Sequence, residues 1–154
     1  MVTLDAPTAY LAAPWSRRHL MPGIAQTLAA RGVRVLSTWD RYPDTTDPGI
    51  LSTCAQRDFD EVQQAVFFVL LYPHIVSMGK SVELGRALTL RKRVIVVDPQ
   101  ISRAGCIFYH LPQIHYAPSV QAAADFMLNL DLPFIEQAHS LDQPERDPLR
   151  TCQP

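Results

Sequence analysis

The chain has 154 residues, of which 14 are Lys or Arg and 15 are Asp or Glu, so its formal net charge is −1. This balance argues against a basic surface that coats a nucleic-acid polymer. Hydrophobic residues make up 47% of the sequence, which is enough to bury a core and excludes a wholly disordered chain. Thirteen prolines against six glycines are the main compositional excess.

No apolar stretch approaches the ~20 residues that a membrane-spanning helix needs. The longest uninterrupted one is 65–72, and the chain opens without the basic and apolar regions of a signal peptide. The three cysteines, Cys54, Cys106 and Cys152, include no CxxC pair, which is typical of a reducing compartment. We therefore expect a cytoplasmic protein without a membrane partner.

The start of the chain predicts two strands around one helix. Residues 8–13 predict a strand, and 17–31 predict a helix because their apolar residues recur three or four positions apart. Pro22 suits the first turn of this helix, and Gly32 suits its end. The second strand is expected over 33–37.

The middle of the chain continues this alternation. Residues 39–55 are rich in Pro, Asp and Thr and predict a long loop, which we expect to shape a base pocket. A short helix is expected over 57–65. The uniformly apolar runs 66–71 and 94–97 predict strands buried on both faces, with a helix over 81–91 between them.

The last elements are an edge strand over 114–116 and a helix over 119–130 with Ser119 as its N-cap. Strands that alternate with helices indicate an α/β fold. We expect a doubly wound, Rossmann-like or flavodoxin-like sheet of about five mostly parallel strands with helices on both faces. Residues 1–135 would form this domain, and 136–154 a polar tail.

Several common motifs are absent. There is no GxGxxG fingerprint and no HExxH, and the five histidines are scattered. Gly79-Lys80-Ser81 resembles the end of a Walker A loop, but His74 stands where that motif needs a glycine. We therefore predict no cofactor and no metal site.

The junction between the third strand and its helix carries Ser77, Gly79 and Ser81. Free N–H groups and the helix dipole favour an anion at such a place, typically a phosphate. Glu83 is expected in the first turn of the helix, turned toward the cleft. The alternative is that both serines are simple caps and that Glu83 is an ordinary surface residue.

Four stretches resemble the nucleoside 2-deoxyribosyltransferase family. They are AYLAAPWSRR (9–18), QRDFDEVQQAVFFVLL (56–71), SMGKSVELGRAL (77–88) and IFYHLPQIHYAPSVQAAADFM (107–127). The RD, QQA and ELGRA motifs occur in the family's order and spacing. The resemblance covers about three-quarters of the chain and does not include the tail.

The resemblance implies three catalytic residues. Glu83 would be the nucleophile that forms a covalent ester with the sugar C1′. Asp58 would be the general acid that protonates the leaving base, so that two carboxylates divide the work as in glycoside hydrolysis. Tyr10 would hydrogen-bond Glu83 and crowd the 2′ position, which implies a 2′-deoxy preference.

Position 77 separates the branches of the family. Base-exchanging members resemble one another in carrying an aspartate six residues before the nucleophile, whereas this chain has Ser77, as do the 2′-deoxynucleoside 5′-phosphate N-hydrolases. A serine hydroxyl can donate to a 5′-phosphate that a carboxylate would repel. The residues that the resemblance and the loop positions suggest for substrate binding are Ser77, Gly79, Ser81, Ala13, Trp15, Ser16, Arg17 and Cys106.

The favoured function is therefore an N-glycosidase that releases the base from a nucleoside 5′-monophosphate. The alternatives are a deoxyribosyltransferase that exchanges bases and a non-catalytic nucleotide-binding domain of the same fold. The resemblance also implies a homodimer with its sites near the interface. Cys106 stands where the family places a serine or asparagine that reaches the neighbouring site.

Overall fold

The computed structural model describes residues 6–100 and 106–129, so the predicted tail 136–154 lies outside the described residues. A five-stranded sheet with the order β2-β1-β3-β4-β5 forms the centre of the molecule. Every pair of neighbouring strands is parallel. The strands are β1 (Thr8–Ala12), β2 (Arg34–Val35), β3 (Phe67–Leu71), β4 (Arg93–Val97) and β5 (Ile114–Ala117). The predicted doubly wound α/β fold is confirmed, and its strand order is the flavodoxin-like one.

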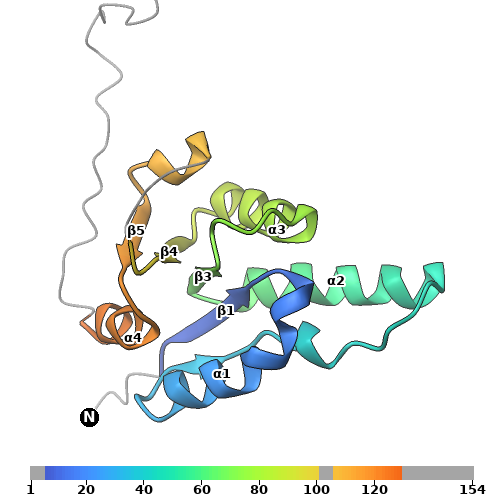
Figure 1. The fold of residues 1–154 in the computed structure, drawn as a ribbon, viewed down its shortest axis with the longest axis horizontal. Coiled ribbons are helices and arrows are strands. Elements are labelled where there is room, and N and C mark those ends of the chain that lie inside the picture. The colour runs from blue at the N-terminus through green and yellow to red at the C-terminus, as the bar shows by residue number, and fades with distance from the viewer. Residues whose placement is uncertain (1–5, 101–105, 130–154) are drawn as a thin grey trace, which may run out of the picture.

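Helices cover both faces of the sheet. Figure 1 shows α1 (Met21–Ala29) and α4 (Val120–Leu128) on one side, and α2 (Pro48–Gln64) and α3 (Met78–Thr89) on the other. Every residue of β1 and β3 is buried as a result. This double coverage explains why β3 is apolar at every position, and β1 at every position after Thr8, rather than at alternate ones.

The prediction of a loop over 39–55 is wrong in its second half. Helix α2 begins at Pro48, and the Asp47 side chain accepts a hydrogen bond from the Ile50 N–H over 2.9 Å. Proline fits the first helical position because its missing N–H has no partner there in any case. Pro48 is therefore a helix start rather than a loop residue. The first half of α2 projects beyond the sheet (Figure 1).

Two other helices differ from their predicted bounds. The predicted helix 17–31 is a 3₁₀ helix, η1 (Trp15–Leu20), followed by α1, and Gly32 ends the unit with a φ of 86°. The predicted helix 81–91 begins earlier, at Met78, so Glu83 lies in the second turn of α3 and not in the first. The predicted start of the last helix agrees better with the structure, since Ser119 caps α4 by accepting a hydrogen bond from the Ala122 N–H.

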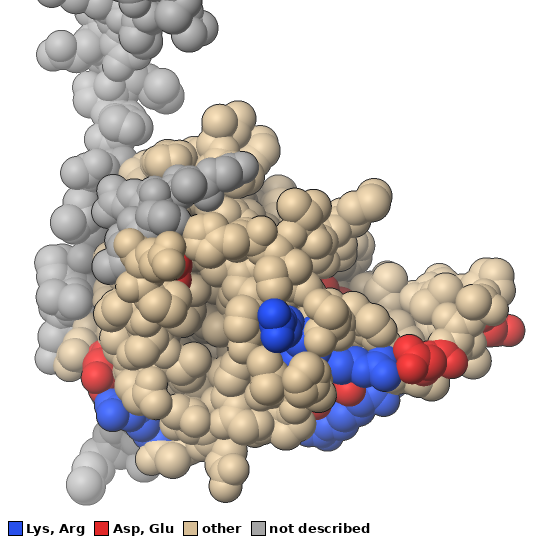
Figure 2. Space-filling view, viewed as in Figure 1, with Lys and Arg blue, Asp and Glu red and all other residues tan. Residues whose placement is uncertain are grey.

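The face of the molecule in Figure 2 carries few charged side chains, and both signs occur among them. This agrees with the near-neutral composition and shows no continuous basic patch on that face. None of the helices within 6–100 and 106–129 is both long enough and apolar enough to cross a bilayer.

Candidate active site

The order in which the chain adds strands reverses between β1 and β3. From β1 the chain adds β2 on one side, and it then returns to add β3 on the other side of β1. In doubly wound folds, ligands bind at the carboxyl ends of the strands at such a switch point. Here β1 leads through Ala13 into η1, and β3 leads through 72–77 into α3. The loops that carry the predicted binding residues therefore leave the sheet at adjacent points.

Tyr10 and Glu83 meet above the centre of the sheet. The Tyr10 hydroxyl donates a hydrogen bond to Glu83 Oε1 over 3.0 Å, which is the contact that the resemblance implied. Tyr10 is fully buried and its ring stacks on Phe68, with 5.8 Å between centroids. The stacking fixes the ring, so the hydroxyl holds the carboxylate in one orientation.

Helix α2 brings two more carboxylates to the same place. Asp58 Oδ1 accepts a hydrogen bond from the Tyr42 hydroxyl over 2.8 Å. Glu61 binds Thr38 with both oxygens, at 2.6 Å from the hydroxyl and 3.0 Å from the backbone N–H. Because residues three apart share a helix face, Asp58 and Glu61 approach Glu83 together.

The two helices that carry these carboxylates are joined directly. Arg86, three residues after Glu83, donates to the Phe59 carbonyl and to Gln63 Oε1. Its guanidinium also lies over the Phe59 ring, 4.8 Å from the centroid. The arginine of ELGRA therefore contacts the first glutamine of QQA, which fixes Glu83 relative to Asp58.

Burial and mutual repulsion raise the pKa values of the paired acids. Burial is the largest cause of the rise in the Glu83 pKa to about 8, and the charge of Asp58 adds to it, while the Tyr10 hydrogen bond opposes it. Burial also raises the pKa of Asp58 to about 6; the Tyr42 hydrogen bond opposes this rise, and Glu61 adds to it. The pKa of Tyr10 is raised for the same reasons, so it remains a hydrogen-bond donor.

Sequence reasoning did not identify Glu61, Tyr42 or Thr38 as parts of this cluster. A signal for Glu61 was present, since it follows Asp58 by three residues in a helical segment. Tyr42 lies in the segment 39–55 that was predicted as a loop, and Thr38 lies between that segment and the predicted second strand. Nothing in their local pattern indicates a contact with a helix some 16 to 23 residues away.

The predicted phosphate-binding residues lie at the start of α3. Ser77 is the N-cap residue, but its side chain makes no capping hydrogen bond, and its carbonyl accepts one from the Ser81 hydroxyl over 3.0 Å. Gly79 is exposed, and a side chain there would meet nothing within 4 Å. The N–H groups of Met78 and Gly79 have no acceptor among the described residues. Ser77 and these N–H groups are therefore available to an anion, whereas the Ser81 hydroxyl is already engaged.

The first loop places Trp15, Ser16 and Arg17 at the surface, all in η1 and all exposed. Trp15 packs against Trp39 with 6.3 Å between ring centroids, and Arg17 lies over the ring of Tyr72 at 5.5 Å. Arg17 thus connects the loop after β1 with the loop after β3.

The remaining two predicted binding residues are less exposed. Ala13 is 8% exposed at the end of β1, so little of it is open to a ligand. Cys106 is half-buried before η3 (Ile107–His110), and its carbonyl accepts a hydrogen bond from the Tyr109 N–H.

A cavity of about 250 Å³ lies on the other face of β1. Successive side chains in a strand point to opposite faces, and the cavity is lined by Leu11 and not by Tyr10. It is therefore separate from the carboxylate cluster. Among residues 6–100 and 106–129, no group of three or more His, Cys, Asp or Glu side chains is arranged to hold a metal ion.

No protein-family model matches the sequence, and no curated protein matches it. The solved structures that are similar to it include two enzymes. The CMP N-glycosidase BcmB of Clostridium botulinum is 18% identical with a TM-score of 0.54, over 81% of this chain and 99% of that one. A 2-deoxyribosyltransferase of Bacillus psychrosaccharolyticus is 17% identical with a TM-score of 0.59, over 77% of this chain and 90% of that one. The chain therefore has the fold of these two proteins along nearly their whole length.

Proposed function

We propose that the chain is a member of the nucleoside 2-deoxyribosyltransferase family and an N-glycosidase of nucleoside 5′-monophosphates. The observation that carries this proposal is the pairing of Glu83 with Tyr10 beside Asp58. A binding domain needs no two half-buried carboxylates that repel each other, because the repulsion only costs stability. Glycosidic cleavage needs both of them.

In the proposed reaction, the Glu83 carboxylate attacks C1′ while the N-glycosidic bond breaks. Asp58 gives its proton to the base nitrogen, and the free base leaves. Water then attacks C1′ of the glycosyl ester, and its proton goes to Asp58. The products are the base and the sugar 5-phosphate, and both carboxyl groups return to their starting states.

Three features of this chain support a phosphorylated substrate. Ser77 stands in place of the aspartate of base-exchanging members, and the N–H groups at the start of α3 are available. Arg17 adds a positive charge from the neighbouring loop. One similar structure is by its name a CMP N-glycosidase, which also favours a monophosphate.

Base exchange is the second candidate function. It shares the covalent glycosyl-enzyme step and differs only in the acceptor, which would be a second base instead of water. The observation that favours it is the similarity to a 2-deoxyribosyltransferase, whose TM-score of 0.59 is the higher of the two.

The direct test is incubation of the purified protein with ribo- and deoxyribonucleoside 5′-monophosphates and the matching nucleosides, followed by chromatography of the bases. We expect free base from at least one monophosphate. Exchange of base between unphosphorylated nucleosides would favour the second candidate instead. Tight binding of nucleotides without any turnover would contradict both enzyme functions.

We expect Ser77→Asp to weaken the use of a monophosphate about 100-fold in kcat/KM, and the use of the matching nucleoside much less. The new carboxylate would repel the 5′-phosphate at short range and remove a donor. Ser81→Ala is the matched control, because that hydroxyl is engaged within the helix. Equal losses on both substrates would show that position 77 does not contact the phosphate.

A homodimer is also part of the proposal. Ile50 and Leu51, in the projecting part of α2, are 44% and 48% exposed. Val76 and Met78, beside the start of α3, are 95% and 84% exposed. Exposed apolar side chains near a proposed site are typical of an interface that a second copy would cover. Light scattering of the purified protein measures this state.

A further inference from the structure

Lys80 is a buried lysine beneath the turn that follows β3. It lies in the first turn of α3, yet only 3% of it is exposed. Its Nζ donates hydrogen bonds to the carbonyls of Tyr72 and Ile75, over 2.7 and 2.8 Å. With the residues of 6–100 and 106–129 it forms no ion pair. Burying an ammonium group against two carbonyls alone costs free energy of folding. A buried lysine at this position therefore suggests a role that offsets the cost.

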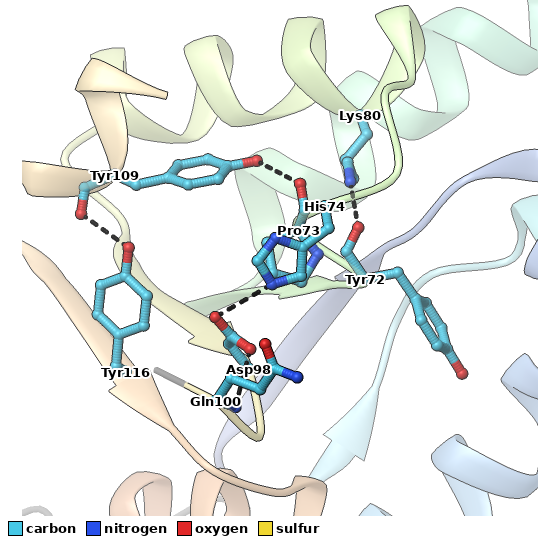
Figure 3. Close-up of polar contacts among 8 residues, drawn as sticks. All are labelled: Tyr72, Pro73, His74, Lys80, Asp98, Gln100, Tyr109 and Tyr116. Carbon is cyan, nitrogen blue, oxygen red and sulfur yellow. Dashed lines mark hydrogen bonds and ion pairs between the residues drawn. The ribbon is translucent and has the colours of Figure 1, made fainter. Parts of the chain in front are cut away.

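The two carbonyls belong to a tight and strained turn. The Ile75 N–H donates to the Tyr72 carbonyl over 3.1 Å, and Tyr72 has a φ of 53°. This left-handed conformation is unfavourable for a residue other than glycine, so the surroundings must hold it in place. Figure 3 shows Lys80 reaching from α3 to the Tyr72 carbonyl, while the Tyr72 ring points away from Lys80.

The same turn places residues on both sides of the proposed phosphate site. Ser77 follows Ile75 by two positions. The Tyr72 ring lies beneath the Arg17 guanidinium, at 5.5 Å from its centroid. One buried ammonium group therefore holds the backbone that leads into Ser77 and that carries the ring beneath Arg17.

Other contacts of the turn involve His74 and Pro73. His74 Nε2 lies 3.3 Å from Asp98 Oδ2, and the Tyr109 hydroxyl lies 3.5 Å from the Pro73 carbonyl (Figure 3). These contacts attach the turn to β4 and η3. They do not reach the carbonyls of Tyr72 and Ile75, and among the described residues Lys80 Nζ is the one donor that binds both of them.

We propose that Lys80 is the positioning residue for recognition of the 5′-phosphate. Its charge-assisted hydrogen bonds to Tyr72 and Ile75 keep Ser77 and Arg17 in the geometry that receives the phosphate, and it acts without touching the substrate. This inference rests on the proposed function and adds to it a residue that neither the phosphate nor the sugar contacts.

The charge of Lys80 responds to pH in a range that can be measured. Burial lowers its pKa to about 8, so above that pH the amine is neutral and its bonds to the two carbonyls weaken. A dianionic phosphate near the turn favours the protonated form and raises the pKa. Among the described residues, the titratable or charged groups in contact with the turn are Arg17, His74, Asp98 and Tyr109.

The first test compares Lys80→Met with Lys92→Met. These are the only two lysines of the chain, and Lys92 Nζ also donates to a carbonyl, that of Gln63, at the amino end of β4. For Lys80→Met we expect KM for a monophosphate to rise about tenfold or more, kcat to stay within about threefold, and nucleoside cleavage to change little. Lys92→Met should change none of these values.

The second test needs no substitution at Lys80. With lysine labelled by ¹³C and ¹⁵N, the two side-chain signals are assigned through Lys92→Arg and titrated between pH 6 and 11 by NMR. Addition of 2-deoxyribose 5-phosphate should raise the titration midpoint of Lys80, and 2-deoxyribose should not.

The outcomes of these tests separate the role of Lys80 from the proposed function. An unchanged midpoint, or equal losses on monophosphate and nucleoside in Lys80→Met, overturns the role of Lys80 while the proposed function stands. A wild-type protein that neither cleaves nor binds any monophosphate overturns both.

Discussion

Replacing Glu83 by Gln is expected to reduce base release from a nucleoside monophosphate by a factor on the order of 10⁴. Glutamine keeps the size of the side chain and can still accept the hydrogen bond from Tyr10, but its amide cannot form the glycosyl ester. The loss should appear in kcat and not in KM, because the ground-state contacts of the substrate are unchanged. Single-turnover assays with excess enzyme measure the chemical step directly.

The same variant provides its own control for folding. The pKa of Glu83 is about 8 in the folded protein and ordinarily 4.5, so the folded state holds this proton more tightly than the unfolded state. Stability therefore falls as the pH rises from about 4.5 to 8 and the buried carboxylate ionises. Glu83→Gln removes this cost, so its free energy of unfolding at pH 9 should exceed that of the wild type by about 2–4 kcal/mol, with little gain at pH 4.

A covalent intermediate can be sought at the same time. Rapid quenching followed by digestion and mass spectrometry should find the sugar phosphate on the peptide that contains Glu83. Base release by Glu83→Gln at the rate of the wild type would contradict the nucleophilic role. A variant that is inactive but also less stable than the wild type at pH 9 would contradict the electrostatic account of the cluster.

The sequence predicted the fold well because the central strands carry a strong signal. Residues of β3 and β4 are apolar at nearly every position, and such runs are short enough to be strands and not helices. The start of α2 was missed because Pro48 and Gly49 are loop residues in most contexts. Only the Asp47 side chain, which accepts the Ile50 N–H, makes this proline a helix start.

Sequence reasoning identified candidate catalytic residues only where they belong to a motif of the family that the chain resembles. The RD and ELGRA motifs led to Asp58 and Glu83 as candidates, and in this chain Arg86 binds Gln63 and so joins the two helices that carry them. Contacts such as Tyr42 with Asp58 depend on how the loop after β2 folds over α2. No periodicity encodes them.

Lys80 illustrates a different limit of sequence reading. Lysine is rarely buried, so a pattern-based reading of α3 places it on the solvent side. In the structure, the helix begins at Met78 and turns this side chain under the preceding loop. The residue type alone therefore does not indicate burial, whereas the carbonyls of a strained turn create a place for its charge.

The pH dependence of kcat/KM is expected to be bell-shaped, with limbs near pH 6 and pH 8. These are the pKa values of Asp58 and Glu83, and because the two groups interact they belong to the pair. Below about 6 the pair holds two protons and no carboxylate can attack C1′. Above about 8 it holds none, and no proton is available for the leaving base. Activity therefore requires the single-proton state between the two limbs. The higher pKa belongs to Glu83, so Glu83 holds this proton in most molecules of the free protein, and the reaction proceeds from the form in which the proton has moved to Asp58.

Asp58→Asn tests the origin of both limbs. The general acid is lost, so the rate should fall about 10²–10³-fold and the alkaline limb should disappear. The remaining limb then reports Glu83 alone, and because the charge of Asp58 is one cause of its raised pKa, this limb should lie below pH 8. Asp60→Asn, on the exposed side of the same helix, is the matched control and should leave the profile unchanged.

The assay also separates this pair from Lys80, whose pKa lies near the alkaline limb. With a nucleoside that lacks the phosphate, the contribution of Lys80 falls away, and both limbs should persist in Lys80→Met. An alkaline limb that survives in Asp58→Asn would mean that another group donates the proton. Glu61 is then the next acid to replace, because its charge raises the pKa values of both members of the pair.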